Sequence, residues 1–147
     1  NIIDKYRIPH KLIDFEITET TADNTNDSLD KIMKYFNEKG INFSLDDFGT
    51  GYSNQSNIMQ YPYSIVKIDK SMVWACDSNP KAFVSLKHTV AMIKDLDMVV
   101  LAEGVETEEQ KKLLNEIGVE YLQGYYFSRP LPVAEIVNIL KENISKN

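Results

Sequence analysis

Residues 41–51 read INFSLDDFGTG: a short apolar run, then two adjacent aspartates, then a turn with two glycines. The run predicts a β-strand over residues 42–46, and the glycines allow the backbone to turn sharply after it. The carboxylates of Asp46 and Asp47 repel each other, and burying them costs free energy unless a cation compensates. This stretch therefore predicts a strand with a polar site at its C-terminal end.

Charged side chains also end three other short apolar runs in the chain. They are Glu16, Lys67 and Glu103, and with Asp46 they follow one another at intervals of 30, 21 and 36 residues. Each interval is about the length of one strand plus one helix. The C-terminal ends of parallel strands lie at one edge of a sheet, so this spacing predicts that the four side chains converge on one site.

The alternation of strand and helix patterns continues over the whole chain. Strands are predicted over residues 13–18, 42–46, 64–68, 98–102 and 120–122, and helices over 27–39 and 53–61, from 80 onward, over 107–118 and over 133–144. Trp74 and Cys76 are predicted to lie in a loop after the third strand. Five strand–helix units in a row predict an α/β fold with a parallel sheet and right-handed crossovers.

Two architectures fit such a pattern: an open doubly wound sheet, and part of a TIM-like (β/α)8 barrel. A complete barrel needs eight units and about 250 residues, so the 147 residues of this chain supply only about five units of one. The charged strand ends favour the partial barrel. Barrel sites draw on the C-terminal ends of many strands, whereas an open sheet concentrates its site at one point.

The composition limits the class of protein. The net charge is −6, from 22 acidic and 16 basic residues, which argues against DNA binding and against direct contact with an anionic membrane surface. Cys76 is the single cysteine, which excludes a disulfide framework and favours a reducing, cytoplasmic location. The apolar run 98–102 is too short to cross a bilayer. Because the chain begins with Asn1 rather than Met, we expect a longer parent protein, whose other domains can include a membrane anchor.

Each candidate side chain also has a structural interpretation. The aspartate pair suits Mg²⁺, which takes carboxylate oxygens together with waters and phosphate, but acidic turns with glycines are common. Lys67 lies in an apolar strand, where it either pairs with Asp69 or holds a water or a phosphate oxygen at the site. Glu16 either faces that site or is a solvated strand end. Glu106 is best interpreted as a charge that favours a helix N-terminus.

Five strings in the sequence, in their order and spacing, resemble the EAL-type cyclic-di-GMP phosphodiesterases of bacteria. The strings are FEITE (15–19), DDFGTGYS (46–53), VKIDK (66–70), AEGVET (102–107) and QGYYFSRPL (123–131). They extend over nearly the whole chain, and five ordered motifs make the match specific. The resemblance implies a TIM-like barrel that hydrolyses one phosphodiester bond of cyclic di-GMP, giving linear pGpG.

The resemblance also implies a set of metal ligands. Glu16, Asp46 and Asp47 are similar to the family's metal ligands in these motifs. The resemblance implies Mg²⁺ or Mn²⁺, with two ions in the complete domain. Glu19 is similar to the glutamate that holds the loop after Asp47, so its implied role is structural.

Three further residues are implied to take part in the reaction. Lys67 is similar to the lysine that positions the attacking water. Glu103 is similar to the glutamate that acts as a base or binds through a metal-bound water. Gln123 is similar to the glutamine that supports that water.

The sequence departs from the family at its beginning. It lacks the Glu-Ala-Leu tripeptide that names the family, and it opens just before the strand that carries Glu16. We therefore expect residues 1–147 to be the C-terminal portion of one incomplete EAL-type barrel domain, inactive on its own. The alternative is a catalytically silent module that binds cyclic di-GMP or another protein. Because a partial barrel exposes two sheet edges, we also expect a homodimer or a strand-exchanged assembly.

Overall fold

The computed structural model describes residues 2–18, 21, 28–50 and 55–144. Over these residues, five parallel strands lie side by side in sequence order. The strands are β1 (Asp14–Thr18), β2 (Asn42–Phe48), β3 (Ile65–Ile68), β4 (Val99–Ala102) and β5 (Tyr121–Leu122). A doubly wound sheet reverses its strand order at a switch point, whereas a barrel does not, so this order confirms the partial-barrel prediction.

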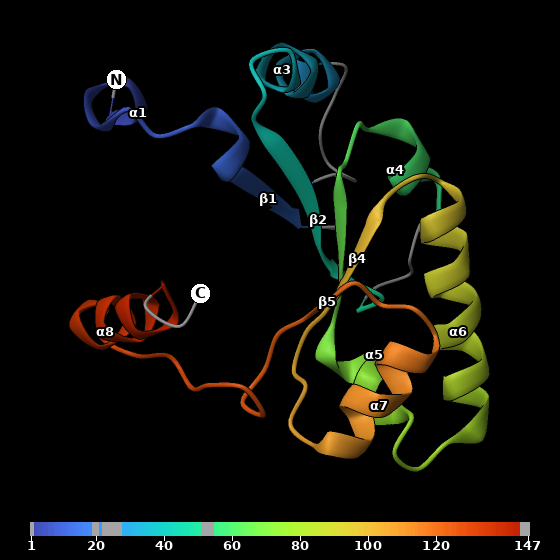
Figure 1. The fold of residues 1–147 in the computed structure, drawn as a ribbon. Helices are drawn as coiled ribbons and strands as arrows, with labels where there is room; N and C mark the ends of the chain where they lie inside the picture. Colours follow the sequence, from blue (N-terminus) through green and yellow to red (C-terminus); the bar gives the residue numbers. More distant parts are fainter. Residues whose placement is uncertain (1, 19–20, 22–27, 51–54, 145–147) are drawn as a thin grey trace.

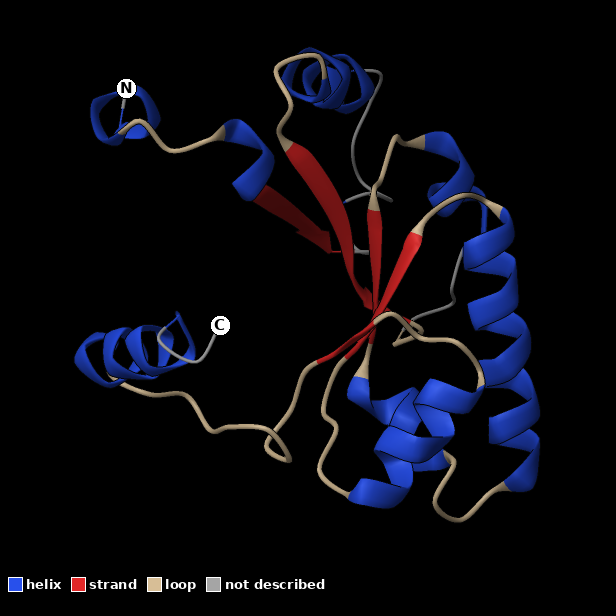
Figure 2. Cartoon of the chain, in the orientation of Figure 1, coloured by secondary structure: helices blue, strands red, loops and turns tan. Residues whose placement is uncertain are grey.

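The helices that connect the strands cover one face of the sheet, as Figures 1 and 2 show. The helices of the described residues are α1 (Ile2–Tyr6), the short 3₁₀ helix η1 (His10–Leu12), α3 (Ser28–Asn37), α4 (Gln55–Gln60), α5 (Lys70–Ala75), α6 (Pro80–Asp95), α7 (Glu108–Glu116) and α8 (Val133–Ile144). In Figure 1, α3, α4 and α6 lie outside the sheet, whereas α1 and α8 lie on its open side. Within the described ranges, no helix combines the length and apolar character that crossing a bilayer requires.

Alternation along each strand separates an apolar outer face from a more polar inner face. The outer side chains are buried against the helices: Phe43, Leu45, Val66, Ile68, Val100 and Ala102 from the strands, with Met33, Leu86, Val90 and Ile93 from α3 and α6. Burying one large aliphatic side chain contributes roughly 1.5–3 kcal/mol, so this layer is a main source of stability. The packing of the outer face also determines which side chains, Ser44 and Lys67 among them, point inward.

Strand β2 is longer than the sequence predicted, because it continues through both aspartates to Phe48. Its register against β3 shifts between Leu45 and Phe48, and Asp47 takes a left-handed backbone conformation with a φ of 57°. Such an irregularity inserts an extra residue into one strand of a pair. It arises from the pairing with β3, and side-chain periodicity therefore did not reveal it.

The loop predicted after β3 is in fact the helix α5, so the prediction was wrong for Trp74, which lies inside this helix. The helix begins after Asp69, whose carboxylate accepts a hydrogen bond from the Ser71 amide at 2.8 Å. A helix of six residues is too short to show a 3.6-residue pattern and is stable only through its packing. Asp69, a residue type that often caps helices, was the signal for this helix in the sequence.

Glu120 links the start of β5 to β4 and to the end of α6. Its carboxylate accepts a hydrogen bond from the Val100 amide at 3.0 Å and lies 3.0 Å from Lys94 Nζ. Burial raises the pKa of Glu120, but the Lys94 ammonium and the Val100 amide together lower it more, so the pKa lies below its usual value. The resulting stabilisation is present above the unfolded-state pKa of 4.5 and is lost as the pH falls through the folded-state pKa.

Replacing Glu120 by glutamine should therefore destabilise the fold at neutral pH. The free energy of unfolding should fall by about 1 kcal/mol at pH 7, a figure reduced for solvent screening because a third of the side chain is exposed. Urea unfolding followed by circular dichroism measures this difference. At pH 3 the difference should shrink, because the ionic stabilisation is lost progressively as the pH falls below the unfolded-state pKa of 4.5. An equal loss at both pH values would contradict the ionic contribution.

Candidate functional site

The Lys67 ammonium lies between carboxylates from three other strand ends, at the C-terminal edge of the sheet. Its Nζ atom is 2.9 Å from Glu16 Oε1 on β1, 2.8 Å from Asp46 Oδ1 on β2, and 2.9 Å from Glu103 Oε1 directly after β4. The structure thus brings together the four side chains whose spacing predicted convergence. Asp69, the structural alternative as a partner for Lys67, caps α5 instead.

Lys67 is the most buried member of this group. Its side chain is 9% exposed, whereas that of Glu16 is 54% exposed. Burial disfavours the charged ammonium, but hydrogen bonds to Asp46, Glu16 and Glu103 outweigh this cost and raise the pKa of Lys67 above its usual value. The stabilisation from the raised pKa is lost only at strongly alkaline pH, so a positive charge is a fixed feature of the site at neutral pH.

Asp46, Asp47 and Glu103 form a group that fits a divalent cation. One carboxylate oxygen from each lies within 4.8 Å of the others. Adjacent residues of a regular strand point to opposite faces, and the irregularity at Asp47 brings both aspartates to the same site. Asp46 Oδ1 is buried and lies 2.8 Å from Lys67 Nζ. Carboxylate oxygens are the ligands that a hard divalent cation prefers, so this donor set fits such a cation.

The backbone that carries Glu103 is held from two sides. The Glu103 amide donates a hydrogen bond to the Ile68 carbonyl at 3.0 Å, and the Trp74 indole donates one to the Gly104 carbonyl at 2.8 Å. Gly104 has a φ of +65°, and a Cβ at this position would lie 2.3 Å from the Lys70 Cβ. Only glycine fits this approach without strain, so the turn that follows Glu103 has a fixed shape.

Gln110 ties the same segment to α7 and to the end of α5. Its side-chain oxygen accepts hydrogen bonds from the Glu106 amide at 2.8 Å and from the Thr107 amide at 3.3 Å. Its side-chain nitrogen donates to the Asp77 carboxylate at 2.9 Å. The Gln110 backbone amide donates a hydrogen bond back to the Thr107 hydroxyl, which completes a capping box at the start of α7. The contact with Asp77 could not be predicted, because it depends on how α5 and α7 pack.

Gln123 follows β5 and lies beside Glu103. Its backbone N–H donates a hydrogen bond to the Ala102 carbonyl at 2.9 Å, and its backbone carbonyl accepts one from the Val105 amide at 3.0 Å. Gln123 and Glu103 line one hollow of about 260 Å³, together with Trp74 and other side chains. The residue that follows the fifth strand thus lies with Glu103 at the same edge of the sheet.

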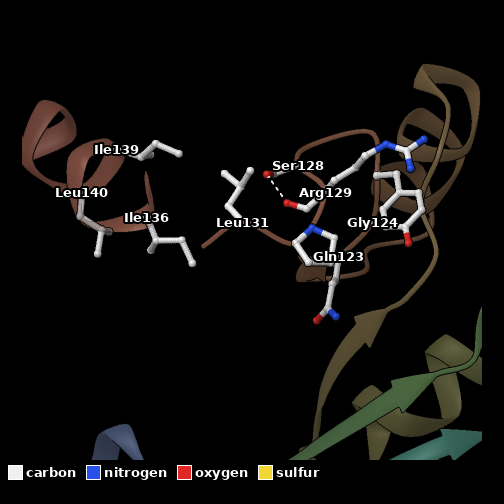
Figure 3. Close-up of a pocket in the computed structure, with 10 residues that line it drawn as sticks. Gln123, Gly124, Ser128, Arg129, Leu131, Ile136, Ile139 and Leu140 are labelled. Atoms are coloured by element: carbon white, nitrogen blue, oxygen red, sulfur yellow. Dashed lines mark hydrogen bonds between the residues drawn. The ribbon is translucent and has the colours of Figure 1, made fainter. Parts of the chain in front are cut away.

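A second cavity, of about 430 Å³, lies between α8 and the segment that follows β5 (Figure 3). Figure 3 shows three apolar side chains of α8 on one side of it, Ile136, Ile139 and Leu140. On the other side, the Arg129 guanidinium lies 4.6 Å from the centre of the Tyr125 ring. This cavity is lined mainly by apolar groups and does not include the ion-paired carboxylates, so we place the chemistry at Lys67.

The sequence did not reveal one further pair on the inner face. The Ser44 hydroxyl donates a hydrogen bond to the Asp14 carboxylate. Burial raises the pKa of Asp14, the bond from Ser44 lowers it, and the nearby Glu16 raises it, so the net direction is upward. A signal was available, because Asp14 and Ser44 each lie two residues before a site residue and therefore share its face. Glu19, the predicted loop anchor, lies outside the described residues.

Comparison with known proteins supports the interpretation of these motifs. The family model for the EAL domain matches residues 1–130. Signaling protein YkoW of Bacillus subtilis is 40% identical over 145 residues, which are 98% of this chain and 18% of YkoW. Cyclic di-GMP phosphodiesterase RocR of Pseudomonas aeruginosa is 31% identical over 131 residues, which are 89% of this chain and 33% of RocR. The chain therefore spans only a minor part of the length of these relatives.

A solved structure is similar over most of the same residues. Klebsiella pneumoniae BlrP1, in a complex with manganese and cyclic di-GMP, superimposes with a TM-score of 0.81 at 30% sequence identity. The match covers 87% of this chain and 33% of BlrP1. The family model, the relatives and the strand order agree, so the chain belongs to the EAL domain family, of which it forms a partial domain.

Proposed function

We propose that residues 1–147 are the C-terminal portion of a domain that hydrolyses one phosphodiester bond of cyclic di-GMP to give linear pGpG. The observation that carries the proposal is the meeting of Lys67 with carboxylates from three strand ends at 2.8–2.9 Å. The names of two similar proteins support the substrate: RocR is a cyclic di-GMP phosphodiesterase, and BlrP1 binds cyclic di-GMP. In this proposal the segment is cytoplasmic, where its single Cys76 stays reduced.

The donor set determines the cofactor that we propose. Asp46, Asp47 and Glu103 would hold Mg²⁺ or Mn²⁺, and Glu16 would contribute to a two-ion site in the complete domain. All of these donors are carboxylate oxygens, the ligands that hard divalent cations prefer. When bound, such a cation lowers the pKa of a coordinated water and neutralises phosphate charge.

The protein's own groups supply the rest of the chemistry. Lys67 holds a positive charge beside the position where negative charge grows on the phosphate, and this lowers the barrier to attack. Glu103 can accept the proton that the attacking water releases. Gln123 lines the same hollow as Glu103, where its amide can orient that water. The turn fixed at Gly104 keeps the Glu103 carboxylate in place without reorganisation during the reaction.

The direct test is turnover by the complete protein that carries this sequence. Incubation with cyclic di-GMP and Mg²⁺, followed by chromatography and mass spectrometry, should show conversion to pGpG. Addition of EDTA should stop the reaction. Binding of cyclic di-GMP without any product would instead support the catalytically silent module. The absence of both binding and turnover would contradict the proposed substrate.

We also propose that residues 1–147, taken alone, are inactive and form a homodimer or a strand-exchanged assembly. Five strands do not close a barrel, and β1 and β5 are both edges of the described sheet. Apolar side chains such as Val133 (77% exposed) and Leu140 (55%) on α8 are open to solvent. Light scattering coupled to size exclusion should give twice the monomer mass. A monomer at micromolar concentration would contradict this assembly.

A further inference from the structure

We infer that the Lys67 ammonium is an internal counter-ion that opposes the binding of divalent cations at the strand ends. This inference rests on the metal site of the proposed function. It adds that the same lysine stabilises the metal-free fold and weakens the affinity for the cation. Lys67 would thus stabilise the fold when no cation is bound and weaken the binding of the cation. Unfolding and binding measurements separate these two effects.

The first support is that the lysine and the cation draw on the same carboxylate groups. Two of the three residues grouped as metal ligands, Asp46 and Glu103, are also partners of Lys67, at 2.8 and 2.9 Å. An ammonium has three N–H donors and no acceptor. With Glu16 as the third partner at 2.9 Å, the Lys67 ammonium lies within ion-pair distance of three separate carboxylates. A cation that draws on these carboxylates must compete with an ammonium that already neutralises them.

The second support is that the Lys67 side chain has little freedom to move away from the carboxylates. It lies in β3, a strand paired on both sides, and is opposite Leu101 in the ladder with β4. Its neighbours Val66 and Ile68 are fully buried on the outer face. Its own side chain is only 9% exposed. The ammonium therefore stays close to any cation held by Asp46 and Glu103, and like charges at such a distance repel each other in a partly buried site.

The same contacts explain why the lysine is needed when no cation is bound. Without Lys67, the carboxylates of Glu16, Asp46, Asp47 and Glu103 would face one another with no positive charge that the described structure places between them. Removing one partner of a buried charge network leaves the others uncompensated and destabilises the fold. Loss of Lys67 should therefore make the fold depend on a divalent cation.

The experiment uses the 147-residue chain with Lys67→Met, which removes the charge and keeps an unbranched side chain. Mn²⁺ binding is titrated by electron paramagnetic resonance, and urea unfolding is followed in EDTA and in Mn²⁺. We expect the Kd for Mn²⁺ to fall about tenfold or more, because the positive charge of Lys67 no longer repels the nearby cation. The urea midpoint should fall below that of the original chain in EDTA and recover on addition of Mn²⁺.

Two further variants keep the test decisive. Lys67→Gln, which retains N–H donors without the charge, should show the same tighter binding and replaces Lys67→Met if that variant does not fold. Lys94→Met removes an equally charged lysine that pairs with Glu120, before β5 and therefore at the opposite end of the sheet. It should leave the Kd for Mn²⁺ unchanged. Equal tightening by Lys94→Met would mean that only net charge matters and would overturn the inference.

The remaining outcomes distinguish the inference from the proposed function. If the original chain binds Mn²⁺ and the Lys67 variants bind it no more tightly, the counter-ion role is wrong while the metal site stands. If none of the proteins binds Mn²⁺, both the metal site and the counter-ion role are wrong. Tight binding by the Lys67 variants together with weak binding by the original chain is the result that we expect.

Discussion

Replacing Asp46 by asparagine should lower kcat for cyclic di-GMP by roughly 10³-fold in the complete protein. Asparagine has nearly the same shape but no negative charge. The substitution therefore removes the ion pair with Lys67 at 2.8 Å and one carboxylate of the group formed with Asp47 and Glu103. The rate of pGpG formation in saturating Mg²⁺, measured by chromatography, gives the size of the effect.

Asp97→Asn is the matched control for this substitution. Asp97 lies just before β4, at the other end of the sheet from Glu103, and has a φ of 59°. Asparagine tolerates this left-handed conformation at least as well as aspartate, so the fold should be unaffected. We expect kcat close to that of the original protein. Turnover by Asp46→Asn at the level of this control would contradict the role of Asp46 as a metal ligand.

Replacing Gly124 by alanine should cause the largest loss of stability, about 3 kcal/mol or more, because the backbone leaves no room for a Cβ. A Cβ at Gly124 would lie 2.0 Å from the Val105 carbonyl oxygen and 2.3 Å from its nitrogen. Relief of this clash requires the segments after β4 and β5 to separate, which breaks the bond from the Val105 amide to Gln123. Urea unfolding of the purified variant measures the loss.

Gly118→Ala supplies the comparison for this prediction. Gly118 has a φ of +83°, so alanine is strained there too, but the nearest atom to its Cβ is the flexible end of Lys94 at 3.1 Å. We expect a loss of only about 1 kcal/mol from the left-handed backbone. If both alanine variants lost the same stability, close packing at Gly124 would not be what holds the two segments together.

The strands and the main helices were predictable because their signals are local. Apolar side chains recur with a period of two residues in the strands and about 3.6 in helices such as α6. The site was predictable for a related reason. A charged side chain at the end of an apolar run is costly to bury, and parallel strands place such ends at one edge of a sheet. The sequence therefore predicted that four side chains converge on one site: Glu16, Asp46, Lys67 and Glu103.

The features that the sequence did not reveal depend on contacts between distant segments. The irregularity at Asp47, which brings two adjacent aspartates to one site, arises from pairing between β2 and β3. The bond from Trp74 to the Gly104 carbonyl joins residues 30 positions apart. The partner of Lys67 was ambiguous between Asp69 and the site, because only the fold shows that Asp69 caps α5. In each of these cases, tertiary contacts determined a feature that the local sequence pattern did not specify.

The most direct test of the metal site is the anomalous scattering of manganese in crystals of this chain grown with Mn²⁺. We predict an anomalous difference peak at the C-terminal edge of the sheet, within about 2.3 Å of carboxylate oxygens of Asp46, Asp47 and Glu103. A map with no peak among these three side chains, or with its peaks only elsewhere on the molecule, would contradict the assignment of this edge as a divalent-cation site.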